Sequence, residues 1–241
     1  MNDIFSELIF KFTIIKRKGF VKSLYNDSGA AGKMFETLLN KKLDNKCLPD
    51  FESIEIKTLS NSNKYPITLF SCLPVKNGYT PGKVIEYLLN NYGYNKDIDC
   101  KCLMINVKDG KIKYCKNKFG FMIKVSNKWK KIYLCIFYKN KIFDTSIHWN
   151  FTEIHNIFNT KLKHLVCVKY IQNITHSDKM FYYYDINCYV LKSFDDVLFA
   201  IKKGIITINF NFSISNGIVK YHGINFVIYE NDLSFIYKKI M

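Results

Sequence analysis

Apolar positions along the chain follow two periods, which predict helices and strands in mixed order. Spacings of three and four residues are typical of a helix with one buried face, and they predict helices over residues 4–15, 28–43, 80–91, 151–162 and 193–203. Apolar, β-branched and aromatic runs predict strands over residues 53–59, 66–72, 132–138, 164–170, 180–190, 205–213 and 218–228, and others between 101 and 143. This mixture favours an α/β or α+β fold with helices on a mixed sheet.

Polar residues at the segment ends predict where elements begin and turn. Asp27 or Ser28 is expected to cap the second helix, and Ser193 to cap the last one, because their side-chain oxygens can accept from free helix N–H groups. Ser215-Asn216-Gly217 is typical of a hairpin turn between the last two long strands. The strand over 132–138 is the most apolar and is expected to be central in its sheet.

The composition of the chain indicates which class of molecule it binds. The chain has 241 residues with a net charge of +16, and 48% of its residues are hydrophobic. This composition predicts a folded protein, and the positive charge favours a polyanion, with nucleic acid ahead of an acidic membrane surface. An AT-rich genome would explain the preference for Lys over Arg, but it does not explain the excess of Lys over Glu. Arg17 is the only arginine.

Cysteine spacing and hydropathy indicate the cellular compartment of the protein. The eight cysteines include Cys100-Lys101-Cys102 but no C-x-x-C pair, so free thiols in a reducing cytosol are expected, and not a zinc site. The N-terminus lacks the features of a signal peptide, and no apolar run approaches the ~20 residues of a membrane span. The sequence therefore predicts a cytoplasmic protein with no membrane segment.

Candidate chemistry lies in Pro49-Asp50 followed by Glu55-Ile56-Lys57. In a strand, Glu55 and Lys57 share one face while Ile56 faces the core. Two carboxylates near each other can hold a hard divalent cation, and a lysine beside them can orient a water against a phosphate, which suits metal-assisted phosphodiester hydrolysis. The alternative is a solvated strand edge, since Glu-x-Lys is a common triplet in a lysine-rich chain. Glu36 is either a surface acid near a helix start or a third acid of this site.

Three segments together resemble the catalytic block of the MvaI/BcnI family of Type II restriction endonucleases, on the MutH-like branch of the PD-(D/E)xK nucleases. They are Gly29–Glu36 (GAAGKMFE), Leu48–Phe51 (LPDF) and Ile54–Thr58 (IEIKT). Weaker matches follow in the same order at Leu69–Ser71, Asn91–Gly93, Trp149–Phe151, Lys161–Lys163 and His222–Gly223. The resemblance therefore extends over nearly the whole chain.

The resemblance implies a PD-(D/E)xK fold with a β-rich DNA-recognition lobe. Residues 1–175 would form mainly the catalytic core and residues 176–241 mainly the recognition lobe of a single compact chain. Asp50 and Glu55 would bind Mg²⁺, for which Mn²⁺ could substitute, and Glu36 would assist. Lys57 would position the attacking water, because a charged lysine is a poor base.

The family also implies an activity and partners. The expected reaction is sequence-specific hydrolysis of double-stranded DNA that leaves 5′-phosphates, by a monomer that nicks each strand in turn. A cognate DNA methyltransferase would belong to the same restriction–modification system. The runner-up is a MutH-like mismatch-repair enzyme that nicks one strand, and a different class is a DNA-binding protein whose acids are only structural. An RNA-binding role is less favoured, because no aromatic RNA-recognition motif is present.

The expected DNA contacts depart from the family. Where relatives carry arginines that read guanine, an approximate alignment places Asn211 and Val227, and asparagine pairs with adenine. We therefore expect Asn211 to read adenine, with a neutral asparagine as the alternative. His222 is either a DNA contact or a residue of a turn. The remaining candidate contacts, to phosphates, are Lys220, Arg17, Lys33 and Lys64.

Overall fold

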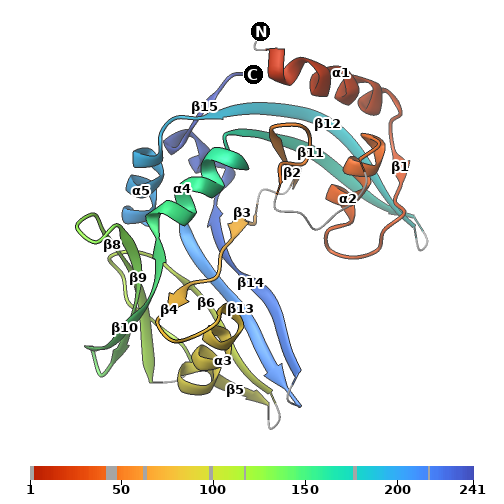
Figure 1. Cartoon of the computed structure of the whole chain (residues 1–241). Coiled ribbons are helices and arrows are strands. Elements are labelled where there is room, and N and C mark those ends of the chain that lie inside the picture. Colours follow the sequence, from red (N-terminus) through yellow and green to blue (C-terminus); the bar gives the residue numbers. More distant parts are fainter. Residues whose placement is uncertain are drawn as a thin grey trace. The chain divides into compact units, whose positions relative to one another are not determined.

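The computed structural model of the chain describes residues 3–41, 48–61, 64–97, 100–116, 118–175, 178–216 and 218–241 (Figure 1). It contains two compact units. Unit 1 comprises Met1–Ile67, Ile157–Lys192 and Ile236–Met241, and unit 2 comprises Thr68–Asn156 and Ser193–Phe235. Each unit gathers segments that are far apart in the sequence.

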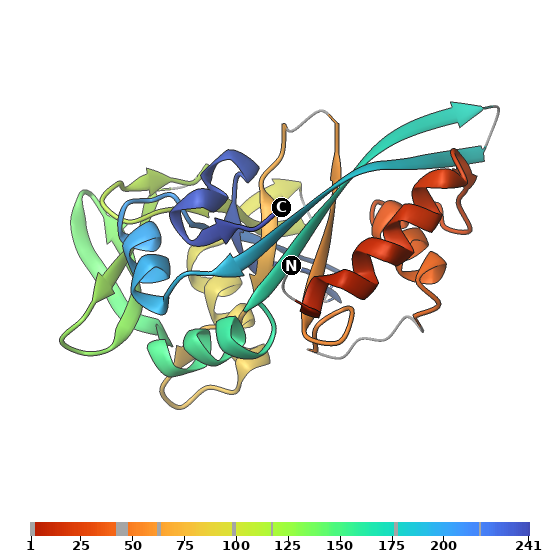
Figure 2. The same ribbon diagram turned by 90° about the horizontal axis from the view of Figure 1, so that it is seen from above.

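Unit 1 holds a five-stranded sheet with two helices. Its elements are α1 (Asp3–Arg17), β1 (Val21–Lys22), α2 (Ala30–Leu38), β2 (Ile54–Ser60), β11 (His164–Thr175), β12 (Asp178–Leu191) and β15 (Tyr237–Lys239). The strand order is β1-β12-β11-β2, and β15 also pairs with β12. β2 runs parallel to β11, whereas the other pairs are antiparallel, so the sheet is mixed as expected. α1 packs against β12 (Figure 2).

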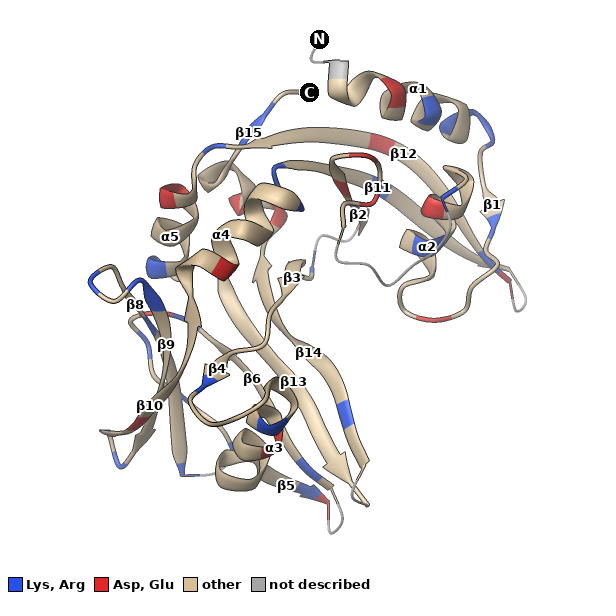
Figure 3. Ribbon diagram, viewed as in Figure 1, with Lys and Arg blue, Asp and Glu red and all other residues tan. Residues whose placement is uncertain are grey.

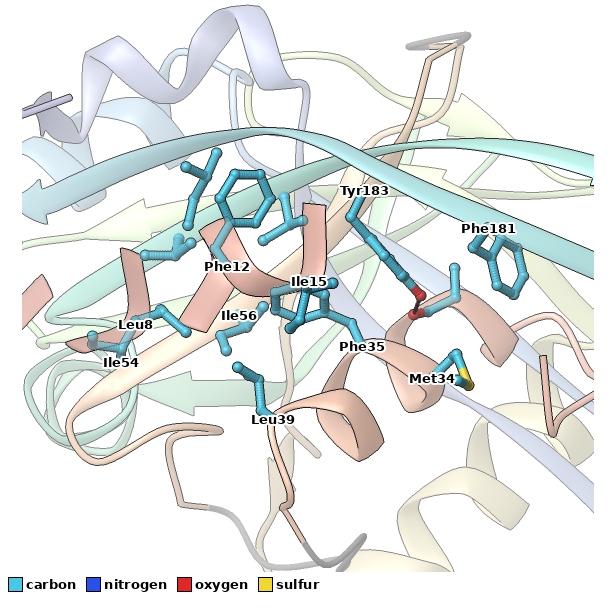
Figure 4. Packing of buried hydrophobic residues seen from close by; sticks show 14 of the residues in the cluster. Leu8, Phe12, Ile15, Met34, Phe35, Leu39, Ile54, Ile56, Phe181 and Tyr183 are labelled. Carbon is cyan, nitrogen blue, oxygen red and sulfur yellow. Dashed lines mark hydrogen bonds between the residues drawn. The ribbon is translucent and has the colours of Figure 1, made fainter. Parts of the chain in front are cut away.

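The core of unit 1 forms where α1 and α2 cover one face of this sheet. Leu8 and Phe12 of α1 and Phe35 of α2 meet Ile54 and Ile56 of β2 in one buried cluster (Figure 4). Because strand side chains alternate, burying Ile54 and Ile56 here sends the side chains of the intervening and following residues to the opposite face. The core therefore determines which face of β2 can carry polar groups.

The ends of α2 differ from the sequence prediction. The helix ends at Leu38, short of residue 43, because Asn40 adopts a left-handed conformation with φ 61°. The N–H of Lys41 then donates to the carbonyl of Glu36 at 3.0 Å, which is the Schellman arrangement that closes a helix. Residues 42 and 43 lie outside the described residues. At its start, the N-cap residue is Gly29 without a side-chain cap bond, while Asp27 accepts from the N–H of Gly29 at 2.8 Å.

Unit 2 holds two five-stranded sheets. The first has the order β4-β10-β9-β8-β7 and the second the order β3-β14-β13-β6-β5. Their strands are β3 (Ile67–Ser71), β4 (Val75–Lys76), β5 (Tyr94–Asp97), β6 (Cys100–Val107), β7 (Lys113–Tyr114), β8 (Phe119–Ser126), β9 (Lys131–Tyr138), β10 (Lys141–Asn150), β13 (Thr207–Ser215) and β14 (Ile218–Ile228). The helices are α3 (Pro81–Tyr92), α4 (Phe151–Thr160, which continues into unit 1), α5 (Phe194–Lys202) and the 3-10 helix η1 (Glu230–Phe235).

Several local predictions for unit 2 are confirmed. β9 is the central strand of its sheet. Ser193 caps α5, where its hydroxyl accepts from the N–H of Asp196 at 3.1 Å. β13 and β14 form the predicted hairpin, in which Ser215 pairs with Ile218. None of the helices in the described parts of the chain combines the length and the apolarity that a membrane crossing requires.

Candidate active site

A tight turn fixes Asp50 to the start of β2. The N–H of Phe51 donates to the carbonyl of Ile54 at 2.9 Å, and the N–H of Ile54 donates back to the carbonyl of Phe51 at 2.7 Å. Glu52, between them, has a φ of 48°. This turn brings Oδ2 of Asp50 to within 2.9 Å of the N–H of Ile56, from which it accepts a hydrogen bond. Asp50 is thus held beside the strand by backbone geometry.

Glu55 and Lys57 share the polar face of β2, as the alternation predicts. The ammonium of Lys57 lies 2.7 Å from Oε1 of Glu55, and the ammonium of Lys161 lies 3.4 Å from the same oxygen. Glu55 is buried, with only 1% of its surface exposed. Its second oxygen, Oε2, is buried without a hydrogen-bond partner among the described residues. A buried carboxylate oxygen in this state is costly unless a cation or donor joins it.

Glu36 joins this group through Lys41. The Schellman turn after α2 brings the Lys41 ammonium within 3.2 Å of Oδ1 of Asp50 and within 3.7 Å of Oε2 of Glu36. All three side chains are about four-fifths buried. The structure therefore brings Glu36, Asp50, Glu55 and Lys57 into one neighbourhood. Lys41 and Lys161, to which the sequence pattern assigns no role, lie there as well.

The environment of Glu55 and Glu36 raises the affinity of these two carboxylates for protons. Burial raises the pKa of Glu55 above its ordinary value; Lys57 opposes this, and the charge of Asp50 adds to it. Burial also raises the pKa of Glu36, with a further contribution from Asp50 that Lys41 opposes. Burial away from water and neighbouring like charges both raise the pKa of a carboxyl group, and such pKa shifts are common at functional sites. A bound cation would stabilise the ionised form of both carboxylates and so lower both pKa values.

The chemistry of these oxygens fits a hard divalent cation, although the geometry is that of ion pairs. Among the described residues, no three His, Cys, Asp or Glu side chains are gathered closely enough to form a complete metal-binding group. Two carboxylates with the unpaired Oε2 of Glu55 suit an ion that also takes oxygens from water and a phosphate. The Asp50 and Glu55 donors thus fit Mg²⁺ as a partial ligand set.

The two lysines differ in how far the sequence could have revealed them. Lys161 stands in the Lys161–Lys163 stretch of the family resemblance, at the end of α4, but that stretch suggested no role. Lys41 gives no motif at all, since its position depends on the left-handed turn at Asn40. A lysine-rich sequence offers many equivalent candidates, and only the fold selects these two.

Three of the predicted DNA contacts lie together in unit 2. On β13, side chains alternate so that Asn209 and Asn211 point away from the buried Phe210. β14 has a bulge opposite Asn211, so that this one residue lies opposite both His222 and Gly223. Further along the hairpin, Ser213 pairs with Lys220. We refer to one side of this sheet as the Asn211 face; its residues are Asn106, Asn209, Asn211, Lys220, His222 and Asn225. Val227, by contrast, is buried, with 3% of its surface exposed.

The other three predicted contacts lie in unit 1. Arg17 ends α1 and is exposed, and Lys64 is exposed as well. Lys33 of α2 forms an ion pair with Asp27, and its ammonium lies 5.8 Å from the centre of the Tyr25 ring. Lys33 is therefore already partnered, whereas Arg17 and Lys64 have no ion pair with a described residue.

In unit 1 an acid-bearing strand lies in a mixed sheet whose other face is covered by helices, and this arrangement is consistent with the fold of a PD-(D/E)xK nuclease. Comparison with known proteins gives the family. Residues 9–237 match the MvaI/BcnI restriction endonuclease family. The chain belongs to this family and is a Type II restriction endonuclease, an enzyme that cleaves DNA at specific sequences.

Solved structures support the fold. The chain is similar to restriction endonuclease MvaI in a complex with its cognate DNA substrate, with a TM-score of 0.89, 24% identity, and coverage of 99% of this chain and 98% of that one. It is also similar to MvaI in the absence of DNA, with a TM-score of 0.63, 24% identity, and coverage of 100% and 99%. No curated protein matches the chain.

Proposed function

We propose that this restriction endonuclease hydrolyses double-stranded DNA in a Mg²⁺-dependent reaction at the Asp50–Glu55–Lys57 site and leaves 5′-phosphate ends. The observation that carries the proposal is Oε2 of Glu55. It is a buried carboxylate oxygen without a partner among the described residues, while Oε1 is bound by Lys57. A cation at Oε2 would neutralise it without displacing the lysine.

Each residue has a separate task in this proposal. Asp50 and Glu55 would hold the divalent ion, which would supply Lewis-acid chemistry for the attacking water and the phosphate. Lys57, held at Glu55, presents its ammonium to the attacking water and to the phosphate. Glu36 keeps Lys41 beside Asp50 and adds negative charge that attracts the ion. Lys161 offers a second ammonium for the phosphate.

The DNA contacts complete the proposal. MvaI has been solved with a cognate DNA substrate, and the similarity of the fold suggests that this chain also binds duplex DNA. Unit 1 supplies the chemistry, and the Asn211 face of unit 2 reads the sequence, with Asn211 at an adenine and His222 and Lys220 beside it. Arg17, Lys33 and Lys64 contact phosphates, so the affinity should fall steeply with salt.

Separate single variants at the site test the proposal. Asp50→Asn, Glu55→Gln and Lys57→Ala are each expected to abolish Mg²⁺-dependent cleavage of duplex DNA while DNA binding, measured by gel shift in Ca²⁺, is retained. Mn²⁺ should support cleavage by the unmodified enzyme. Undiminished cleavage by any of the three variants would overturn the assignment of that residue.

The course of plasmid cleavage tests how the enzyme works on two strands. We propose a cytoplasmic monomer that nicks each strand in turn, with host DNA protected by a cognate methyltransferase. Open-circular plasmid should therefore accumulate before linear plasmid, at a rate first-order in enzyme. Arrest at the open circle would favour the MutH-like alternative, and DNA binding without any Mg²⁺-dependent cut would favour the non-catalytic one.

A further inference from the structure

Asparagines form a row across the second sheet of unit 2. Asn209 of β13 pairs with Asn106 of β6 on one side and with Asn225 of β14 on the other. Residues paired in this way have their side chains about 4.5–5.5 Å apart on one face of the sheet. Asn211 lies two residues further along β13 on the same face. The Asn211 face therefore carries four amides within a small area.

Two of these amides are already used within the protein. Nδ2 of Asn106 donates to Oγ1 of Thr207 at 2.7 Å. Oδ1 of Asn225 accepts from the hydroxyl of Ser71, and its Nδ2 lies 3.3 Å from the carbonyl of His222. Asn225 also packs directly against Gly223, whose φ of 109° is open to glycine and strained for other residues. Asn225 thus fixes the bulge that brings His222 opposite Asn211.

The amides of Asn209 and Asn211 are different. Both are half-buried, and neither makes a side-chain hydrogen bond with any residue in the described part of the chain. Neither amide is among the buried side-chain atoms that lack a partner, so both reach solvent and are available to a ligand. Each can donate and accept at once, and adenine offers the matching pair, N7 and the N6 amino group, in the major groove.

The spacing of the two asparagines matches the spacing of stacked bases. Residues i and i+2 of a strand are about 6.8 Å apart, because a strand rises about 3.4 Å per residue. Two base-pair steps cover the same distance, at about 3.4 Å each. The major groove also admits a two-stranded β-ribbon. The β13–β14 hairpin can therefore place Asn209 and Asn211 at two bases that have one base pair between them.

The charge of the same strands favours DNA over other partners. Over their described lengths, β6, β13 and β14 contain neither Asp nor Glu, and they also lack Arg, the usual reader of guanine. Lys220 is exposed on the Asn211 face. Figure 3 shows acidic residues on other elements of unit 2 but none on β13 or β14. A polyanion can thus approach this face without meeting a like charge on β6, β13 or β14.

From these observations we infer that Asn209 is a second specificity-determining residue, and that Asn209 and Asn211 together read two adenines separated by one base pair. This inference rests on the proposed function for its ligand, duplex DNA. Asn225 is a positioning residue that fixes the bulge. The recognition sequence should therefore contain A-N-A on one strand, where N is any base.

Selection by binding tests this independently of cleavage. Random duplexes are selected by gel shift in Ca²⁺ with the unmodified protein, Asn209→Ala, Asn211→Ala and the control Asn231→Ala, which alters an exposed residue of η1. The unmodified protein and the control should select A-N-A. Each alanine variant should lose discrimination at one of the two adenines by about 5- to 150-fold and keep the other. Thermal unfolding should show all three variants folded.

Cleavage of the same library in Mg²⁺ is a second measurement. It distinguishes a failure of the inference about Asn209 and Asn211 from a failure of the proposed function. Binding selection of A-N-A without cleavage would contradict the proposed function and leave the base reading intact. Cleavage at a site without A-N-A would support the proposed function and overturn the inference. A uniform loss of affinity for all sequences in the alanine variants would show that the two asparagines contact phosphates, and this would also overturn it.

Discussion

Replacing Asp50 by Asn changes one charge at the site and little of its shape. Oδ2 of Asp50 accepts from the N–H of Ile56 at 2.9 Å, and Oδ1 accepts from Lys41 at 3.2 Å. The amide oxygen of Asn can keep the first bond. The NH₂ group would then face the Lys41 ammonium, a donor opposite a donor, while Lys41 keeps Glu36 at 3.7 Å.

The expected cost to stability follows from that lost contact, and it is reduced because removing the charge of Asp50 relieves its repulsion with Glu36 and Glu55. A hydrogen bond to a charged group contributes about 1.5–3 kcal/mol, and the lower end applies here because Lys41 keeps a second acid and is 21% exposed. For a chain of this size, 1 kcal/mol corresponds to about 2–4 °C in Tm. We therefore expect Asp50→Asn to lower Tm by about 3–6 °C. The cleavage rate should fall by on the order of 10²–10³-fold or more, because a charge that acts on the transition state is removed.

The matched control is Asp178→Asn, the same chemical change in an exposed ion pair of unit 1, where Lys22 lies 2.7 Å away. An exposed pair contributes at most about 1 kcal/mol, so this variant should cleave normally. Differential scanning fluorimetry and single-turnover plasmid cleavage measure the two quantities. The reasoning would be refuted if Asp50→Asn cleaved within tenfold of the unmodified enzyme, or if it failed to fold while Asp178→Asn folded.

Three further changes test separate parts of the structure. Tyr183→Phe removes a buried hydroxyl that donates to the carbonyl of Ala31 at 2.7 Å, so denaturant titration should show a loss of about 1 kcal/mol; an unchanged midpoint would contradict this. Lys161→Met should reduce cleavage by about 10–100-fold in single-turnover assays without unfolding the protein, and full activity would remove Lys161 from the site. The pKa of Glu55 is raised in the folded chain relative to about 4.3 in the unfolded chain. The free energy of unfolding should therefore decrease as the pH rises from about 4.3 through the pKa of the folded chain. In chelator, Glu55→Gln should therefore raise Tm relative to the unmodified protein at pH 8 but not at pH 4, and an equal difference at both pH values would refute this.

The strand chemistry of the site could be predicted from sequence because it depends on local periodicity. The alternation in β2 separates Glu55 from Ile56 whatever the rest of the chain does. The parallel pairing of β2 with β11 does not follow from local pattern, since the two strands lie more than a hundred residues apart. Pairing over such distances depends on the whole core.

The residues that the sequence did not reveal depend on single backbone features. Lys41 reaches the acids only because α2 stops at Leu38 and Asn40 turns left-handed. Similarly, His222 lies opposite Asn211 only because a bulge with Gly223 shifts the register of β14. The apolar spacing predicts a helix to about residue 43, whereas α2 ends at Leu38, because the spacing continues beyond the point where the helix closes.

We propose that this restriction endonuclease cuts both strands of duplex DNA with the help of a divalent cation at Asp50 and Glu55. The most direct measurement is to digest long genomic DNA of varied composition with the purified protein, in Mg²⁺ and in chelator, and to sequence the ends. We predict ends at one short sequence, with 5′-phosphates on both strands, in Mg²⁺ only. Ends that form equally in chelator, or 5′-hydroxyl ends, would contradict the account.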